Sequence, residues 1–261
     1  QIIDCANNGC DLGFRTVVLQ GGEDGFFSSK DIEYLIAEIK KHHPDMAVTL
    51  SVGERDRDTY RLWYEAGADR YLLRHETHNQ AHYRMLHPKG LSIENRIECL
   101  YILREIGYQV GAGFMVGSPY QTIDHIVEDL LFLKEFEPEM VGIGPFIAHK
   151  DTPFAHMENG SYRLTLKLIA IIRLLLQDVL LPATTALGTI NPRGREEGIL
   201  AGANVVMPNL SPVDVRIKYS LYDNKICTGE EAAECIACLK NRVNSVGYNI
   251  VTNRGDHRKK V

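Results

Sequence analysis

The 261-residue chain contains 44% hydrophobic and 24% charged residues, enough apolar material for a core, and this excludes an intrinsically disordered protein. Its net charge of −5 excludes a strong electrostatic attraction to nucleic acid or to anionic membranes. The richest apolar stretch, at 168–176, is far shorter than the ~20 residues that span a bilayer.

Helix and strand patterns alternate along the whole chain. A helical pattern opens the sequence and ends at Gly13. Further helices are predicted to start at Ser29, at Ser92 with an end at Gly107, at Thr122, at Ser161 with an end at Leu180, and over 231–246. Short β-branched or apolar runs predict strands at 16–20, 48–52, 70–74, 109–116, 140–146, 181–187 and 205–209.

This alternation predicts an α/β fold, because helices that separate strands so regularly imply parallel pairing with crossover helices. Seven units in a row favour a (βα)8 TIM-type barrel that lacks its first strand, with a doubly wound open sheet as the competing fold. We expect an open edge between 16–20 and 205–209. The barrel domain is expected over 1–246, with a cysteine-containing segment at 219–246 and a frayed basic tail at 247–261.

Side chains alternate between the two faces of a strand, and this indicates a polar chamber inside the barrel. One face of a strand presents Arg70 and Arg74, and another strand presents Thr49 and Ser51. An arginine inside a barrel is costly unless an anion pairs with it. Either a bound anion or an internal carboxylate could satisfy these arginines, and both interpretations stay open.

The loops that follow the strands carry candidate binding residues. The loop Gly21–Asp24 combines glycines with carboxylates and suits an ammonium group, although a tight turn with capping acids is the alternative. Glu76 could accept two ribose hydroxyls or pair with a neighbouring histidine. The surrounding histidines are expected to be solvated or to lie on helix faces rather than to bind metal: His75, His78, His82 and His87.

Three of the six cysteines have metal-ligand spacing. Cys227, Cys235 and Cys238 can converge on one soft metal or an iron–sulfur cluster, although three buried, unliganded cysteines are the alternative. A structural role is expected for the others, Cys5, Cys10 and Cys99. So few cysteines indicate a reducing compartment, and we expect the cytoplasm.

Strings in successive units resemble the HydE family of radical S-adenosylmethionine (SAM) enzymes, which mature [FeFe]-hydrogenase. Biotin synthase and methylornithine synthase are more distant relatives, and a function like theirs is an alternative. The strings are VVLQGGED (17–24), VTLSVGE (48–54), AGADRYLLRHET (66–77), ENR (94–96), GAGFMVG (111–117), MVGIGPF (140–146), PATTALGTI (182–190), NPRGRE (191–196) and GANVVMPN (202–209).

The resemblance implies a [4Fe–4S] cluster on a CxxxCxxC loop, and SAM that is cleaved to a 5′-deoxyadenosyl radical. It implies that Gly21, Gly22, Glu23 and Asp24 receive the methionine ammonium, Arg96 its carboxylate and Glu76 the ribose. Thr49 and Ser51 flank the cofactor, and Ile143 contacts the adenine. The residues implied to line the substrate end are Arg74, Thr184, Thr185 and Tyr222.

The implied substrate is a small anionic or cysteine-derived iron complex, and the implied partners are other hydrogenase maturases, without nucleic acid or membrane. The cysteine set Cys227, Cys235 and Cys238 matches a possible second iron–sulfur cluster of the family.

Two departures from the family stand out. No CxxxCxxC occurs in the chain, so we expect an N-terminal truncation and, for the chain as given, no radical generation. Tyr120 stands where relatives carry a glycine, which predicts a different backbone in that loop. Two further alternatives stay open: a non-catalytic metal-binding barrel, and a non-radical barrel enzyme that binds an anion through Arg74.

Overall fold

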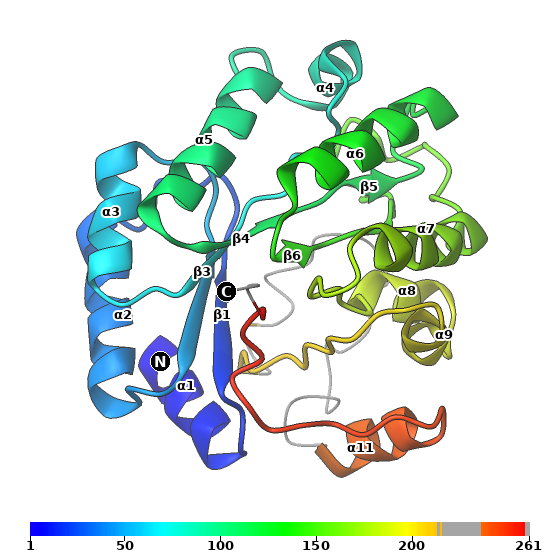
Figure 1. Ribbon diagram of the computed structural model, residues 1–261. Coiled ribbons are helices and arrows are strands. Elements are labelled where there is room, and N and C mark those ends of the chain that lie inside the picture. Colours follow the sequence, from blue (N-terminus) through cyan, green and yellow to red (C-terminus); the bar gives the residue numbers. More distant parts are fainter. Residues whose placement is uncertain (213–214, 216–235, 259–261) are drawn as a thin grey trace.

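A parallel β-sheet forms the centre of the molecule, and helices surround it (Figure 1). The computed structural model describes residues 1–212, 215 and 236–258. The sheet has the order β1-β2-β3-β4-β6, and every neighbouring pair is parallel. Its strands are β1 (Thr16–Gln20), β2 (Ala47–Ser51), β3 (Arg70–Leu72), β4 (Gln109–Ala112) and β6 (Met140–Val141).

Parallel pairing continues beyond this five-stranded sheet, both along the strands and past β6. β5 (Met115–Val116) and β7 (Gly144–Pro145) extend two of the units and pair in parallel. Isolated parallel bridges then join Met140 to Leu180 and Pro182 to Val205. Seven successive parallel segments therefore curve around one axis, which confirms the predicted barrel class. Within the described part of the chain, no pairing joins β1 to Val205, as expected for an open edge.

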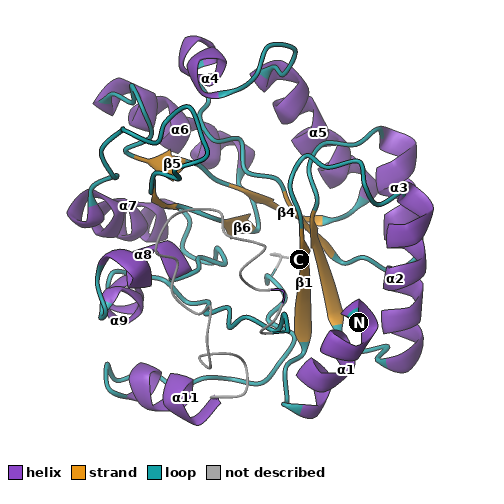
Figure 2. Cartoon of the chain, turned by 180° about the vertical axis from the view of Figure 1, so that it is seen from behind, coloured by secondary structure: helices purple, strands orange, loops and turns teal. Residues whose placement is uncertain are grey.

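The helices form an outer ring, seen from behind in Figure 2. They are α1 (Ile2–Asp11), α2 (Ser29–His42), α3 (Arg57–Glu65), α4 (Gln80–Leu86), α5 (Ile93–Ile106), α6 (Ile123–Phe136), α7 (Tyr162–Leu175), α8 (Thr185–Ile190), α9 (Gly194–Leu200) and α11 (Ile236–Asn244). None of the described helices combines the length and apolarity that crossing a bilayer requires.

Capping side chains fix where several helices begin. Ser92, Thr122 and Ser161 are N-caps as predicted, and each side chain accepts a backbone N–H three residues on. The predicted cap of α2 is wrong by one residue, because Ser28 rather than Ser29 forms a capping box with Asp31.

Several predicted strands differ from the structure. The run at 205–209 contributes only a bridge at Val205, and the run at 140–146 is divided into β6 and β7. The run at 181–187 contributes only a bridge at Pro182, because α8 begins at Thr185. The run at 109–116 is interrupted at Gly113, which has a φ of 152° and whose missing Cβ would lie 2.0 Å from a backbone oxygen of Gly142. The interruption therefore reflects a close approach of two backbones that a side chain would prevent.

The core lies between the strands and the helix ring, and strand alternation decides which side chains enter it. Val48 and Leu50 are completely buried on the outer face of β2. Gly111 lies on the inner face of β4, where a Cβ would meet Leu72 and Met140. The inner and outer faces are thus those that the alternation predicted.

The end of the chain closes the bottom of the barrel, the end at which the strands begin. Arg254 donates to Asp69 at 2.7 Å, and the carbonyl oxygen of Arg254 accepts from Thr16 at 2.8 Å. Asp256 accepts from Arg70 at 2.6 Å. Residues 254–257, here named the C-terminal strap, are therefore held by strands β1 and β3, and the prediction of a frayed tail is wrong for them.

Candidate active site

The charged residues that the sequence proposed for binding lie at the top of the barrel, where the strands end and chemistry is placed in this architecture. The loops after β1, β2 and β3 carry charged side chains, and the first turn of α5 adds a guanidinium. Two charge clusters result. One contains Glu23, Glu54 and Arg96, and the other contains Arg74 and Glu76.

Arg96 lies between two carboxylates. Its Nη1 donates to Glu23 at 2.6 Å, and its Nε lies 3.0 Å from Glu54. Burial alone would lower the pKa of Arg96, but the charges of Glu54 and Glu23 raise it above its ordinary value. Only 7% of the Arg96 side chain is exposed, so its charge is fixed at one place.

Glycine geometry at position 53 allows the first cluster to form. Gly53 has a φ of 82°, and a Cβ there would lie 2.2 Å from a carboxylate oxygen of Glu23. The same carboxylate accepts the backbone N–H of Glu54 at 2.8 Å. Arg55 donates to the carbonyl oxygen of Asp24 at 2.9 Å. The loops after β1 and β2 are thus held together before any ligand binds.

The second cluster is an ion pair on a single strand end. Arg74 donates to Glu76 at 3.0 Å, and their side chains are 32% and 20% exposed. The aliphatic part of the Arg74 side chain packs over Gly142. A Cβ at Gly142 would lie 3.7 Å from Cδ of Arg74, so the Arg74 side chain points inward. For Arg74, the structure shows the internal carboxylate pair that was one of the two expected arrangements. The partner is Glu76, which contacts Arg74 rather than His75 or His78.

The other arginine of the chamber has a different partner. Arg70 is bound by Asp256 of the C-terminal strap at 2.6 Å, at the bottom of the barrel. Thr49 pairs in register with Arg70 and is buried, whereas Ser51 ends β2 nearer the loops. The internal carboxylate pair is therefore the interpretation that holds for Arg70.

The wall formed by β7 and α8 contains the remaining described site residues. The Thr184 hydroxyl is buried without a hydrogen-bond partner, and it would lie 3.1 Å from a Cβ at Gly144. Thr185 accepts from Arg195 at 3.4 Å. Ile143 is completely buried, on the face opposite to that of Gly142 and Gly144. A ligand at this position would therefore meet the backbone rather than the Ile143 side chain.

Two histidines near the site are not solvated. The prediction of solvated or helix-face histidines is wrong for His75, which follows β3, whereas His82 lies on helix α4 as that prediction allowed. His75 and His82 are completely buried. His82 contacts the Thr77 hydroxyl at 3.1 Å and the Pro119 carbonyl oxygen at 2.9 Å. Their side chains bind protein groups, and no cluster that could hold a metal ion occurs among the described residues.

The cysteine set cannot be assembled from the described residues. Cys227, Cys235 and Tyr222 lie outside them, and Cys238 lies on the exposed face of α11. Cys99 is buried in α5. Tyr120 has a φ of 66°, a left-handed conformation that favours glycine, so the tyrosine adopts a glycine-type backbone in this loop.

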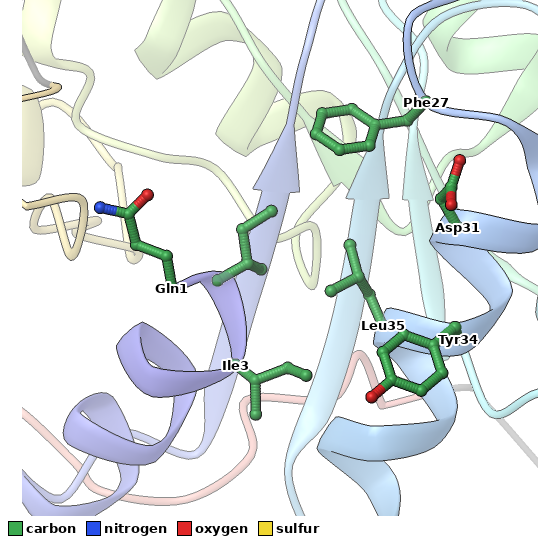
Figure 3. Close-up of a pocket in the computed structure, with 7 residues that line it drawn as sticks. Gln1, Ile3, Phe27, Asp31, Tyr34 and Leu35 are labelled. Carbon is green, nitrogen blue, oxygen red and sulfur yellow. The ribbon is translucent and has the colours of Figure 1, made fainter.

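An open hollow of about 320 Å³ lies between α1 and α2, away from both charge clusters (Figure 3). Its wall is mainly apolar and includes Ile3, Phe27, Tyr34 and Leu35. None of the residues that line it belongs to either charge cluster, so it is not part of the candidate active site.

Comparison with known proteins agrees with this geometry. Residues 1–133 match the radical SAM superfamily. The chain is 51% identical over 247 residues to the [FeFe] hydrogenase maturase subunit HydE of Thermotoga maritima, which covers 95% of this chain and 70% of that protein. It is 27% identical to 3-methylornithine synthase of Methanosarcina acetivorans, over 90% of this chain and 65% of the relative.

Solved structures show the same fold. A crystal structure of methylornithine synthase (PylB) superimposes with a TM-score of 0.81 at 24% identity, over 96% of this chain and 72% of that one. The hydrogenase maturase HydG gives 0.64 at 20% identity, over 78% of this chain and 48% of its own. The barrel and the sequence match thus define a radical SAM protein. Within that superfamily, the chain belongs to the HydE family of [FeFe] hydrogenase maturases.

Proposed function

We propose that this chain binds SAM at the top of its barrel and acts in the maturation of [FeFe] hydrogenase. The observation that carries the proposal is the ion pair between the buried Arg96 guanidinium and the Glu23 carboxylate, together with the Glu76 carboxylate after β3. The 51% identity to a HydE subunit supports the maturation role.

The first charge cluster suits the methionine end of SAM, which carries an ammonium and a carboxylate. Glu23 attracts the ammonium, which replaces Arg96 as its partner. Arg96 attracts the ligand carboxylate, which replaces Glu23 as its partner. Glu54 stays on the Nε side of Arg96 and keeps the guanidinium oriented. The cofactor therefore enters a site whose charges are already paired and placed.

The second charge cluster serves the ribose and the substrate. The Glu76 carboxylate accepts the two ribose hydroxyls, which releases Arg74 toward an anionic substrate. Arg74 Nε and the Thr184 hydroxyl are both buried without a partner, so an anion between them satisfies two unpaired donors. A small carboxylate or a cysteine-derived iron complex fits this chemistry.

The family implies SAM and a [4Fe–4S] cluster, and the residues here fit only the first. SAM bound beside a reduced cluster supplies a 5′-deoxyadenosyl radical. The 261 residues contain no CxxxCxxC motif, so they do not provide the three cysteine ligands that such a cluster requires. A second cluster at Cys227, Cys235 and Cys238, a cytoplasmic setting and contact with other maturases remain parts of the proposal.

Calorimetric titration of the chain with SAM tests the proposal. We expect saturable binding, weakened about tenfold or more in E76Q and in R96K, because each change removes a charge-assisted hydrogen bond. E105Q is the matched control, since the exposed Glu105 pairs with exposed Arg57 and belongs to neither charge cluster. Absence of binding, or equal affinity in E76Q and wild type, would overturn the proposal.

A further inference from the structure

Glu76 has an unusual backbone for a residue with a side chain. Its φ of 65° lies in the left-handed region, which is unfavourable for residues other than glycine. Such a conformation persists only where the surrounding structure holds it. The contacts around Glu76 therefore show what keeps its carboxylate in place.

One set of contacts comes from the neighbouring strand. The backbone N–H of Glu76 donates to the carbonyl oxygen of Gly113 at 3.0 Å. The N–H of Gly113 in turn donates to Nδ1 of His75 at 3.2 Å. The His75 ring and the Glu76 backbone are thus both tied to one glycine, and Nδ1 of His75 acts as an acceptor.

A second set of contacts comes from helix α6. Asp129 is completely buried, and its Oδ1 accepts the N–H of His78 at 2.6 Å. The same oxygen lies 3.3 Å from Nε2 of His75. Since Nδ1 accepts, Nε2 carries the proton and faces the Asp129 carboxylate, in a charge–dipole contact without hydrogen-bond geometry. Asp129 therefore contacts the chain on both sides of Glu76.

The burial of Asp129 beside His75 reduces the stability of the fold, which a purely structural role does not explain. The second oxygen of Asp129 has no hydrogen-bond partner, and the rings of Phe132 and Phe114 lie 4.8 and 6.1 Å from that of His75. A completely buried carboxylate with an unpaired oxygen costs stability that an apolar side chain would not. Its position beside the strained turn that carries Glu76 gives a functional reason for the cost.

We propose that Asp129, acting through His75, is a positioning residue that holds the Glu76 carboxylate toward the ribose hydroxyls of SAM. This inference rests on the proposed function, because it presumes that Glu76 binds the ribose. Asp129 touches no ligand itself. Its role is to fix the backbone from which Glu76 reaches into the chamber, so its loss should affect ribose recognition in particular.

The test compares SAM with an analogue that lacks both ribose hydroxyls, by calorimetric titration. Wild type should prefer SAM by about tenfold or more, since a carboxylate that accepts two hydroxyls gives strong charge-assisted bonds. D129N should lose most of this preference while keeping its affinity for the analogue. D124N is the matched control, because Asp124 is an exposed aspartate on the same helix.

H75N keeps the inference testable if D129N fails to fold. An asparagine amide oxygen can still accept from Gly113, whereas the Nε2 group that faces Asp129 is lost. H75N should reduce the hydroxyl preference as D129N does. If E76Q abolishes the preference but H75N and D129N retain it, the positioning role is overturned. If E76Q itself retains the preference, the ribose assignment in the proposed function fails instead.

Discussion

Arg70 and Arg74 point to the same side of one strand, four residues apart, and have opposite surroundings. Arg70 is 5% exposed and pairs with Asp256, which lies 186 residues later in the sequence. Arg74 is 32% exposed and pairs with Glu76, two residues away. A remote, buried pair ties distant parts of the chain together, whereas a local, open pair can exchange its partner for a ligand. The bottom of this barrel therefore contributes stability, whereas the top provides charged groups that are free to bind a ligand.

The largest expected difference is the effect of each arginine on stability. R70A should lower the free energy of unfolding by about 3 kcal/mol, because it removes three hydrogen bonds of a buried guanidinium, to Thr16, to the Arg254 carbonyl oxygen and to Asp256. R74A should cost less than about 1 kcal/mol, since solvent screens its pair. Urea unfolding of both variants measures this difference. Equal losses of unfolding free energy in R70A and R74A would show that the two arginines do not differ in their contribution to stability.

The C-terminal strap should make stability depend on pH. Burial alone would raise the pKa of Asp256, but hydrogen bonds from Arg254 and Arg70 hold it below its ordinary value of 3.8. The stabilisation is therefore complete above about pH 4 and is lost as the pH falls through the lower, folded-state pKa.

D256N should cost about 1.5 kcal/mol at pH 7, at the low end for a charged hydrogen bond because Asp256 is 38% exposed. The difference from wild type should shrink below pH 4 in urea unfolding followed against pH. A constant difference from pH 7 to pH 3 would show that the charge of Asp256 does not carry the effect.

A small effect on stability, but a selective effect on binding, is expected at Gly53. G53A and G13A both place a side chain at positive φ, with an expected cost of about 1 kcal/mol each. Only G53A also displaces the Glu23 carboxylate, since nothing lies within 4 Å of a Cβ at Gly13. SAM titration should therefore weaken about tenfold in G53A alone. Similar affinities of both variants for SAM would show that Glu23 does not contribute to SAM binding.

Strands with local signals were predictable from the sequence. The run Thr16–Gln20 was predicted with its observed bounds, because β-branched and apolar residues in a buried parallel strand leave a clear pattern. The run at 181–187 was mistaken for a strand, since a short apolar stretch does not distinguish a strand from the first turn of a helix such as α8. The short helices α3 and α4 were missed, although Asp56 and Asn79 are their N-caps and gave a usable signal.

The site was predictable only as far as local patterns reach. Glycines and charged residues after strands identified Glu23, Arg74 and Glu76 as candidates, but not their partners. Arg96 binds a carboxylate 73 residues earlier in the chain, and Asp129 reaches a backbone N–H 51 residues away. Such pairings depend on three-dimensional packing. Asp129 did leave one signal, an acidic residue on the buried face of an apolar helix.

A crystal structure of this chain with SAM tests the central claim most directly. We predict that the Glu76 carboxylate leaves Arg74 to accept the ribose hydroxyls, that Arg96 binds the methionine carboxylate, and that Arg70 stays on Asp256. SAM bound elsewhere, or bound at the top with the Arg74–Glu76 pair intact and the ribose held by other groups, would contradict this account of the two ends of the barrel.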